Sequence, residues 1–125
     1  MVSKATLYFA SDGFLLFDRD RAMVLKTFHR PRSSPEDELR GAWYSLGRGL
    51  EEILSDDGIE FVTLISPTKV IDQLEGASLD DYVVSKMYNE IVEKAFTKLL
   101  NIEKRKISYD EYRERHEQAV DELGG

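Results

Sequence analysis

The chain has 125 residues, 42% hydrophobic and 33% charged, which suits one folded domain over residues 1–125. Its 24 acidic and 17 basic side chains give a formal charge of −7, which disfavours nucleic-acid binding over the whole surface. Cysteine is absent, which excludes disulfides and thiolate metal sites, and no apolar run approaches the ~18 residues of a membrane span, so we expect a cytoplasmic protein without a membrane partner.

Three short apolar segments at the N-terminus predict an antiparallel meander. They cover residues 5–10, 14–17 and 22–28. Asp12 and Gly13 separate the first two, and an Asp-Gly pair between apolar runs is a strong hairpin signal. The middle segment is apolar on both faces, so we expect it to be a central strand that is covered on both sides.

A helix and a further strand follow the meander. Ser34 and Pro35 have the features of a helix start, and apolar residues then recur at helical spacing as far as Leu54. Three glycines within this helix indicate a kink or a backbone that packs close to the sheet. Residues 59–65 form the next strand, parallel to an N-terminal one because a helix precedes it. The predicted fold class is α/β (α+β), with about four strands, covering helices and a helical C-terminal third.

The C-terminal part of the chain reads as helical. Between residues 79 and 100 the apolar side chains recur every four positions, a pattern that drifts ~40° per step round a helix. The two ends of this helix should therefore face different neighbours, the core and a partner chain. Ser108 and Glu111 then form a capping box. Residues 101–125 are expected either to dock on the preceding helix or to begin a helical extension.

No catalytic, cofactor-binding or metal-binding motif is found. A nucleophile elbow, a phosphate loop and a Rossmann glycine cluster are all missing from the sequence. A zinc site without cysteine would need both histidines, His29 and His116, together with carboxylates. We therefore predict no catalytic residues, no cofactor and no metal.

An alternative hypothesis is that the protein is an enzyme. A hairpin sheet followed by helix, strand and helix resembles part of a ribonuclease-H-like fold, whose nucleases gather acidic residues around two Mg²⁺ ions. Turn formation and helix capping already account for the acidic residues in question, so the alternative requires them to converge on a metal. The candidates are Asp12, Asp37, Glu38, Asp56 and Asp57.

The one concentrated basic cluster is Lys104-Arg105-Lys106. It reads as a solvated linker between helices, with attraction to RNA or to an acidic partner as the alternative.

The order of features also resembles the N-terminal domain of the Nop family, the scaffold proteins of box C/D ribonucleoproteins. The resemblance rests on residues 13–18 (GFLLFD), on residues 59–65 followed by Ser66-Pro67, and on the basic-then-acidic tail from Lys104 to Leu123. It implies a non-catalytic domain that binds the methyltransferase fibrillarin, which itself holds S-adenosylmethionine. The family's coiled coil and RNA-binding domain are absent from this sequence, so no direct contact with nucleic acid is expected.

The leading prediction is therefore a non-catalytic protein-interaction module whose partner is another protein, such as a fibrillarin-like methyltransferase. Aromatic and methionine side chains are enriched at interface cores, and the alternative for each is a place in the domain core. The candidate partner-binding residues are Tyr82, Met87, Tyr88 and Phe96. The other hypotheses are a metal-dependent nuclease and a self-associating domain that pairs its last helix across a two-fold axis.

Overall fold

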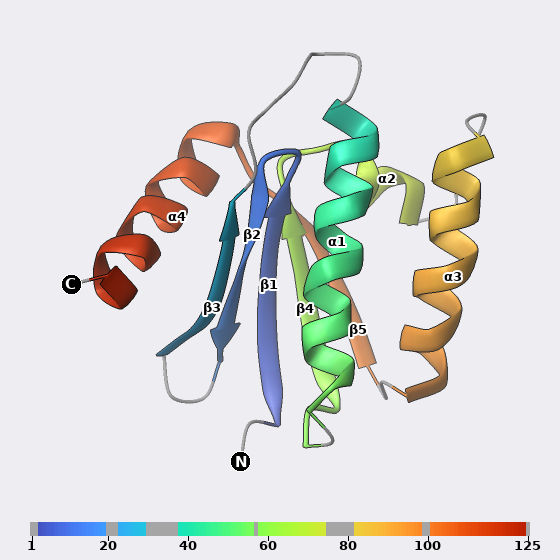
Figure 1. Cartoon of the computed structure of the whole chain (residues 1–125), viewed down its shortest axis with the longest axis horizontal. Coiled ribbons are helices and arrows are strands. Elements are labelled where there is room, and N and C mark those ends of the chain that lie inside the picture. Colours follow the sequence, from blue (N-terminus) through green and yellow to red (C-terminus); the bar gives the residue numbers. More distant parts are fainter. Residues whose placement is uncertain are drawn as a thin grey trace.

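The computed structural model describes residues 3–19, 23–29, 38–56, 58–74, 82–98 and 101–124. Figure 1 shows a sheet with helices on both sides. In chain order the elements are β1 (Lys4–Ala10), β2 (Gly13–Asp18), β3 (Met23–His29), α1 (Glu38–Leu54), β4 (Phe61–Ser66), α2 (Val70–Leu74), α3 (Tyr82–Lys98), β5 (Asn101–Lys106) and α4 (Tyr109–Gly124). The predicted α/β class, with an N-terminal meander and a later parallel strand, is confirmed.

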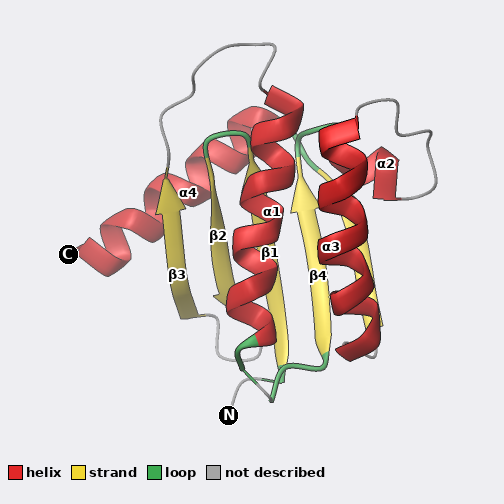
Figure 2. Ribbon diagram, turned by 45° about the vertical axis from the view of Figure 1, so that its right-hand side comes forward, coloured by secondary structure: helices red, strands yellow, loops and turns green. Residues whose placement is uncertain are grey.

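The five strands lie in the order β3-β2-β1-β4-β5. β1 and β2 pair antiparallel, as do β2 and β3, whereas β4 pairs in parallel with both β1 and β5. Helices α1 and α3 cover one face of this sheet, and α4 lies on the other (Figure 2). The three-layer arrangement buries both faces of β2, as its continuous apolar sequence predicts.

The main core lies between the sheet and α1. Every second residue of a strand points at α1, because successive side chains of a strand face opposite sides of the sheet. On the helix, the buried Trp43 donates a hydrogen bond from Nε1 to Oε1 of Gln73 at 2.8 Å, which ties α1 to α2. The fully buried large side chains of this core include Leu7, Phe9, Phe14, Trp43, Leu46, Ile53 and Val70.

Two glycines let α1 approach the sheet closely. A Cβ atom at Gly49 would lie 2.6 Å from Cδ1 of Leu7, and one at Gly41 would lie 2.9 Å from the carbonyl oxygen of Ser11. The glycines therefore serve close packing of the helix backbone against β1 and the β1–β2 turn. The start of the helix that was predicted at Ser34 and Pro35 lies outside the described residues.

The fifth strand was not predicted. Residues 101–106, including the basic cluster, form the edge strand β5 and not a linker between helices. Only Ile102 and Lys104 of this strand are half-buried, because an edge strand has one neighbour and exposes most of its side chains. Its polar sequence therefore carries no strand-like apolar pattern.

Helix α4 packs on the sheet and not on the preceding helix. It contacts β3, β1 and β2, where Ala119 joins Leu15 and Val24 in a second, smaller apolar cluster. The predicted cap is present, since the amide of Glu111 donates to Oγ of Ser108 at 3.2 Å. Within the described ranges, no helix combines the length and the apolar character that crossing a membrane requires.

Candidate functional site

One edge of the sheet gathers the ends of several elements. Strands β1, β3, β4 and β5 run in the same direction and so end at the same edge, where α1 and α4 begin (Figure 1). Ends of parallel strands beside helix N-termini are a common place for ligand sites in open sheets. We call this region the carboxyl edge, and its residues are Ser11, Asp12, His29, Glu38, Ser66, Pro67, Thr68, Lys69, Lys106, Tyr109, Tyr112 and His116.

Two tyrosines of α4 lie at the carboxyl edge, and one of them contacts a carboxylate. The hydroxyl of Tyr109, the first residue of α4, donates a hydrogen bond to Oε1 of Glu38, the first residue of α1. Tyr112 is only 2% exposed, and its hydroxyl has no hydrogen-bond partner among the described residues. Burial raises the pKa of Tyr112, and the charges of Asp12 and of Tyr109 raise it further. The buried hydroxyl therefore keeps its proton and can act as a donor.

The end of β4 carries hydroxyl groups. Oγ of Ser66 and Oγ1 of Thr68 lie 2.7 Å apart, both residues are buried, and the amide of Thr68 donates to Oγ of Ser66. Beside this pair lies a groove of about 450 Å³. It is lined by Glu38, Leu39, Pro67, Thr68, Lys69, Lys106 and Tyr109.

Both histidines of the chain meet at this edge. The ring centroids of His29, at the end of β3, and His116, on α4, lie 6.0 Å apart. The ring of His116 also lies 5.8 Å from that of Tyr112. Nothing in the sequence indicates this contact, because it depends on how α4 packs against β3.

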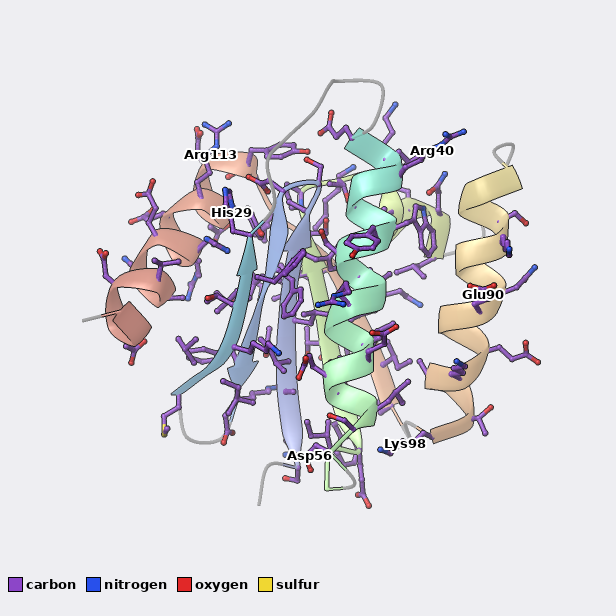
Figure 3. All side chains as sticks on the ribbon, viewed as in Figure 1. His29, Arg40, Asp56, Glu90, Lys98 and Arg113 are labelled. Atoms are coloured by element: carbon purple, nitrogen blue, oxygen red, sulfur yellow. The ribbon has the colours of Figure 1, made fainter. Side chains whose placement is uncertain are left out.

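The described residues do not form a two-metal site of the kind that nucleases use to clamp a phosphodiester. Asp12 and Glu38 reach the carboxyl edge, but no group of three acidic or histidine side chains suited to a metal occurs within the described ranges. Asp56 lies at the opposite end of the sheet, near Lys98 (Figure 3), where its carbonyl accepts a hydrogen bond from that lysine. Asp37 and Asp57 lie outside the described residues. We therefore derive no hydrolytic step through metal ions.

A second groove lies on the α4 side of the sheet. Because α4 packs on β3, β1 and β2, the half of this face formed by β4 and β5 carries no helix in the described part of the chain. We call this surface the β1–β5 groove; its volume is about 270 Å³. The groove is lined by Thr6, Tyr8, Arg19, Thr63, Ile65, Glu103, Lys104 and Arg105.

Cations gather round the β1–β5 groove. At its ends Lys4 stacks on the ring of Phe61 at 5.9 Å, and Arg115 stacks on the ring of Tyr8 at 5.8 Å. Arg19 crosses its middle, with Nη1 3.4 Å from Oγ1 of Thr63.

One carboxylate, Glu103, lies among these cations, and its Oε2 is 3.9 Å from Nη1 of Arg19. Both side chains of this pair are more than half exposed, so solvent screens their attraction. Lys4, Arg19, Arg105 and Arg115 are all exposed. The groove is therefore a locally basic surface on an acidic protein.

The residues predicted to bind a partner all lie in α3. The side chains of Tyr82, Met87, Tyr88 and Phe96 lie outside the described part of the structure, so their prediction stays untested.

The comparisons with known proteins concern the fold. No family model matches the sequence, and no curated protein matches it significantly. The N-terminal RNase H domain of a Mycobacterium tuberculosis protein, solved as a fusion with maltose-binding protein, superposes with a TM-score of 0.72 at 15% identity, covering 88% of this chain and 91% of that one. RNase H1 of the halophilic archaeon Halobacterium salinarum gives 0.68 at 15% identity over 96% and 99%. LC11-RNase H1, in complex with an RNA/DNA hybrid, gives 0.68 at 13% identity over 97% and 99%.

These similarities correct several predictions. The structural neighbours are RNase H domains, so the Nop resemblance and the fibrillarin-binding scaffold function inferred from it are wrong. The resemblance failed because it rested on apolar patterns that many sheets share. The expectation of no direct contact with nucleic acid is also contradicted, since a protein of this fold holds an RNA/DNA hybrid. That expectation rested on the absence of the Nop family's RNA-binding domain and on the net charge, and the net charge hides the local basic groove. The chain has an RNase H-like fold.

Proposed function

We propose that this protein binds nucleic acid, and specifically an RNA/DNA hybrid, along the β1–β5 groove and the adjoining carboxyl edge. The observation that carries the proposal is the set of four exposed cations round the groove, Lys4, Arg19, Arg105 and Arg115, on a chain of net charge −7. Phosphate contacts with lysine and arginine supply most of the affinity of such complexes. The structural similarity to a hybrid-bound protein supports the choice of ligand.

The groove also offers neutral contacts. The half-buried side chains of Tyr8 and Thr63 also line the groove, and both carry a hydroxyl group. Hydroxyl groups donate to phosphate and to sugar oxygens, which positions a backbone without reading its sequence. We therefore expect recognition by shape and charge, with little sequence preference.

The test is fluorescence anisotropy with a labelled RNA/DNA hybrid, and with double-stranded DNA and double-stranded RNA of the same sequence. We expect the hybrid to bind most tightly at low salt. Arg105→Glu should weaken binding by at least tenfold, because it removes one phosphate contact and adds a repulsive charge. The matched control is Arg113→Glu, which makes the same charge change at a side chain that points away from the sheet (Figure 3). Equal losses in both variants, or no binding at low salt, would refute the proposal.

Hybrid cleavage is a second candidate function. The observation in its favour is that Asp12 and Glu38 both reach the carboxyl edge, where Glu38 accepts a hydrogen bond from Tyr109. If this function is present, the hybrid should be cleaved on incubation with Mg²⁺ or Mn²⁺, and an intact hybrid would exclude it; the described residues by themselves supply no third ligand. Cleavage that is lost in Glu38→Gln would establish the nuclease instead.

The cytoplasmic location expected from the sequence remains a prediction, which fractionation of the source cells would test.

A further inference from the structure

Helix α1 exposes one narrow strip of its surface. Between Arg40 and Glu51 the exposed residues are Arg40, Tyr44, Arg48 and Glu51, whereas the residues between them are buried. The first three recur every four positions and so lie on one side of the helix, over a length of about 12 Å. Tyr44 is 44% exposed, so much of this aromatic side chain is accessible to solvent.

An aromatic stack supports this strip from below. The ring of Phe14 in the core lies 5.5 Å from that of Phe28 on β3, in a stacked arrangement. Phe28 in turn lies 6.3 Å from the ring of Tyr44, and the guanidinium of Arg48 lies 5.4 Å above Phe28. We call the surface formed by Phe28, Arg40, Tyr44 and Arg48 the α1 strip. Packing against the core holds the rings of Phe28 and Tyr44 in place.

The charge of the strip selects an anionic ligand. Its two arginines lie on either side of Tyr44. The nearby carboxylate of Glu52 is neutralised by Lys26, whose Nζ lies 2.6 Å from Oε1 of that glutamate. Glu51 is the acidic residue that follows one turn below Arg48. The surface thus presents an exposed aromatic ring between two cations. It lies in the first part of α1, and Glu38, the first residue of this helix, belongs to the carboxyl edge.

We propose that the α1 strip binds unpaired nucleotides, with a base stacked on Tyr44 and a phosphate held by Arg48. A ring face can stack only on a base that is not already enclosed in a duplex, so the ligand is a single strand. The inference rests on the proposed binding of nucleic acid and adds to it a second surface, on the opposite side of the sheet from the β1–β5 groove. A single-stranded extension of a bound hybrid, continuing from the carboxyl edge along α1, would occupy it.

The test uses fluorescence anisotropy to measure how the 125-residue chain binds three ligands: a blunt RNA/DNA hybrid, the same hybrid with a single-stranded extension, and a free oligoadenylate. Wild type should bind the extended hybrid more tightly than the blunt one. Tyr44→Ala should weaken oligoadenylate binding by about 5- to 100-fold and abolish the gain from the extension, while leaving the blunt hybrid unchanged. Tyr44→Phe should retain wild-type affinity, because it keeps the stacking face.

Two further variants keep the test decisive if Tyr44→Ala folds poorly. Arg48→Glu should lower oligoadenylate affinity and its salt dependence. Val120→Ala, at an apolar side chain that is 45% exposed on α4, serves as the matched control and should change nothing. Unchanged oligoadenylate binding in a folded Tyr44→Ala protein would overturn the inference, even if hybrid binding through the β1–β5 groove is observed. Self-association that depends on Tyr44, measured by sedimentation, would also overturn it by assigning the strip to a second copy of the chain.

Discussion

Replacing Gly13 by alanine tests the geometry of the β1–β2 turn that carries Asp12. The φ angle of Gly13 is 155°, and a Cβ atom there would lie 2.0 Å from the carbonyl oxygen of Phe28. The same Cβ atom would lie 2.9 Å from the carbonyl carbon of Phe28, whereas non-bonded carbon atoms prefer separations of about 3.5–4.0 Å. Since Gly13 pairs with both Ala10 and His29, the methyl group would force β2 and β3 apart at the carboxyl edge.

The cost has two parts that can be added from known magnitudes. A positive φ costs an L-residue about 1–2 kcal/mol, and overpacking against fixed backbone costs a further ~1–3 kcal/mol. Alanine also lowers the conformational entropy of the unfolded chain relative to glycine, which offsets about 0.4–1 kcal/mol of the destabilisation. We expect Gly13→Ala to lower the free energy of unfolding by about 1–5 kcal/mol, which is large beside the ~5–15 kcal/mol that holds a typical domain folded.

Urea denaturation followed by fluorescence measures this change, because Trp43 is the single tryptophan and is fully buried. Gly41→Ala is the control variant. Its Cβ atom would also approach backbone, at 2.9 Å from the carbonyl oxygen of Ser11, but its φ is not positive and alanine favours the helix by up to ~1 kcal/mol. The control should therefore lose less stability than Gly13→Ala. A Gly13→Ala protein within ~0.5 kcal/mol of wild type would refute the described turn and the β2–β3 register.

Three further predictions concern stability. Tyr112→Phe should raise the free energy of unfolding by about 1 kcal/mol at neutral pH, because it removes a buried hydroxyl that has no hydrogen-bond partner in the described part of the chain. Since the folded pKa of Tyr112 lies above its usual value of 10.0, the phenol ionises more readily in the unfolded chain, and the stability of wild type should fall as pH rises above 10. Tyr112→Phe lacks this group and should lose less stability in alkaline urea titrations. Gln73→Ala should cost about 1 kcal/mol through its lost bond to Trp43, seen as a lower urea midpoint; an unchanged midpoint would contradict the bond. A double-mutant cycle on Lys26 and Glu52 should give less than ~1 kcal/mol, because both side chains are more than one third exposed; a larger coupling would show that solvent screens the pair poorly.

Several features of the candidate site escaped sequence-based reasoning for a common reason. The predicted capping box placed the start of α4 correctly, but nothing in it showed that Tyr109 would reach Glu38 on another helix. The carboxylates that were singled out divide between the two ends of the sheet, as Asp12 and Asp56 show. The basic run at residues 104–106 was seen, but its place beside Arg19 and Tyr8 depends on β5 pairing with β4.

The sequence by itself determined the local elements of this protein. The Asp12-Gly13 turn, the apolar run from Phe14 to Phe17 and the helical spacing that ends at Leu54 each act through neighbours in the chain, so short-range propensity and patterning predict them. The tertiary structure alone decided the fifth strand, the meeting of helices α1 and α4 at the carboxyl edge, and the gathering of cations in an acidic chain. These depend on strand register and helix packing between distant segments, where the buried area of the whole domain, and not any local pattern, selects one arrangement.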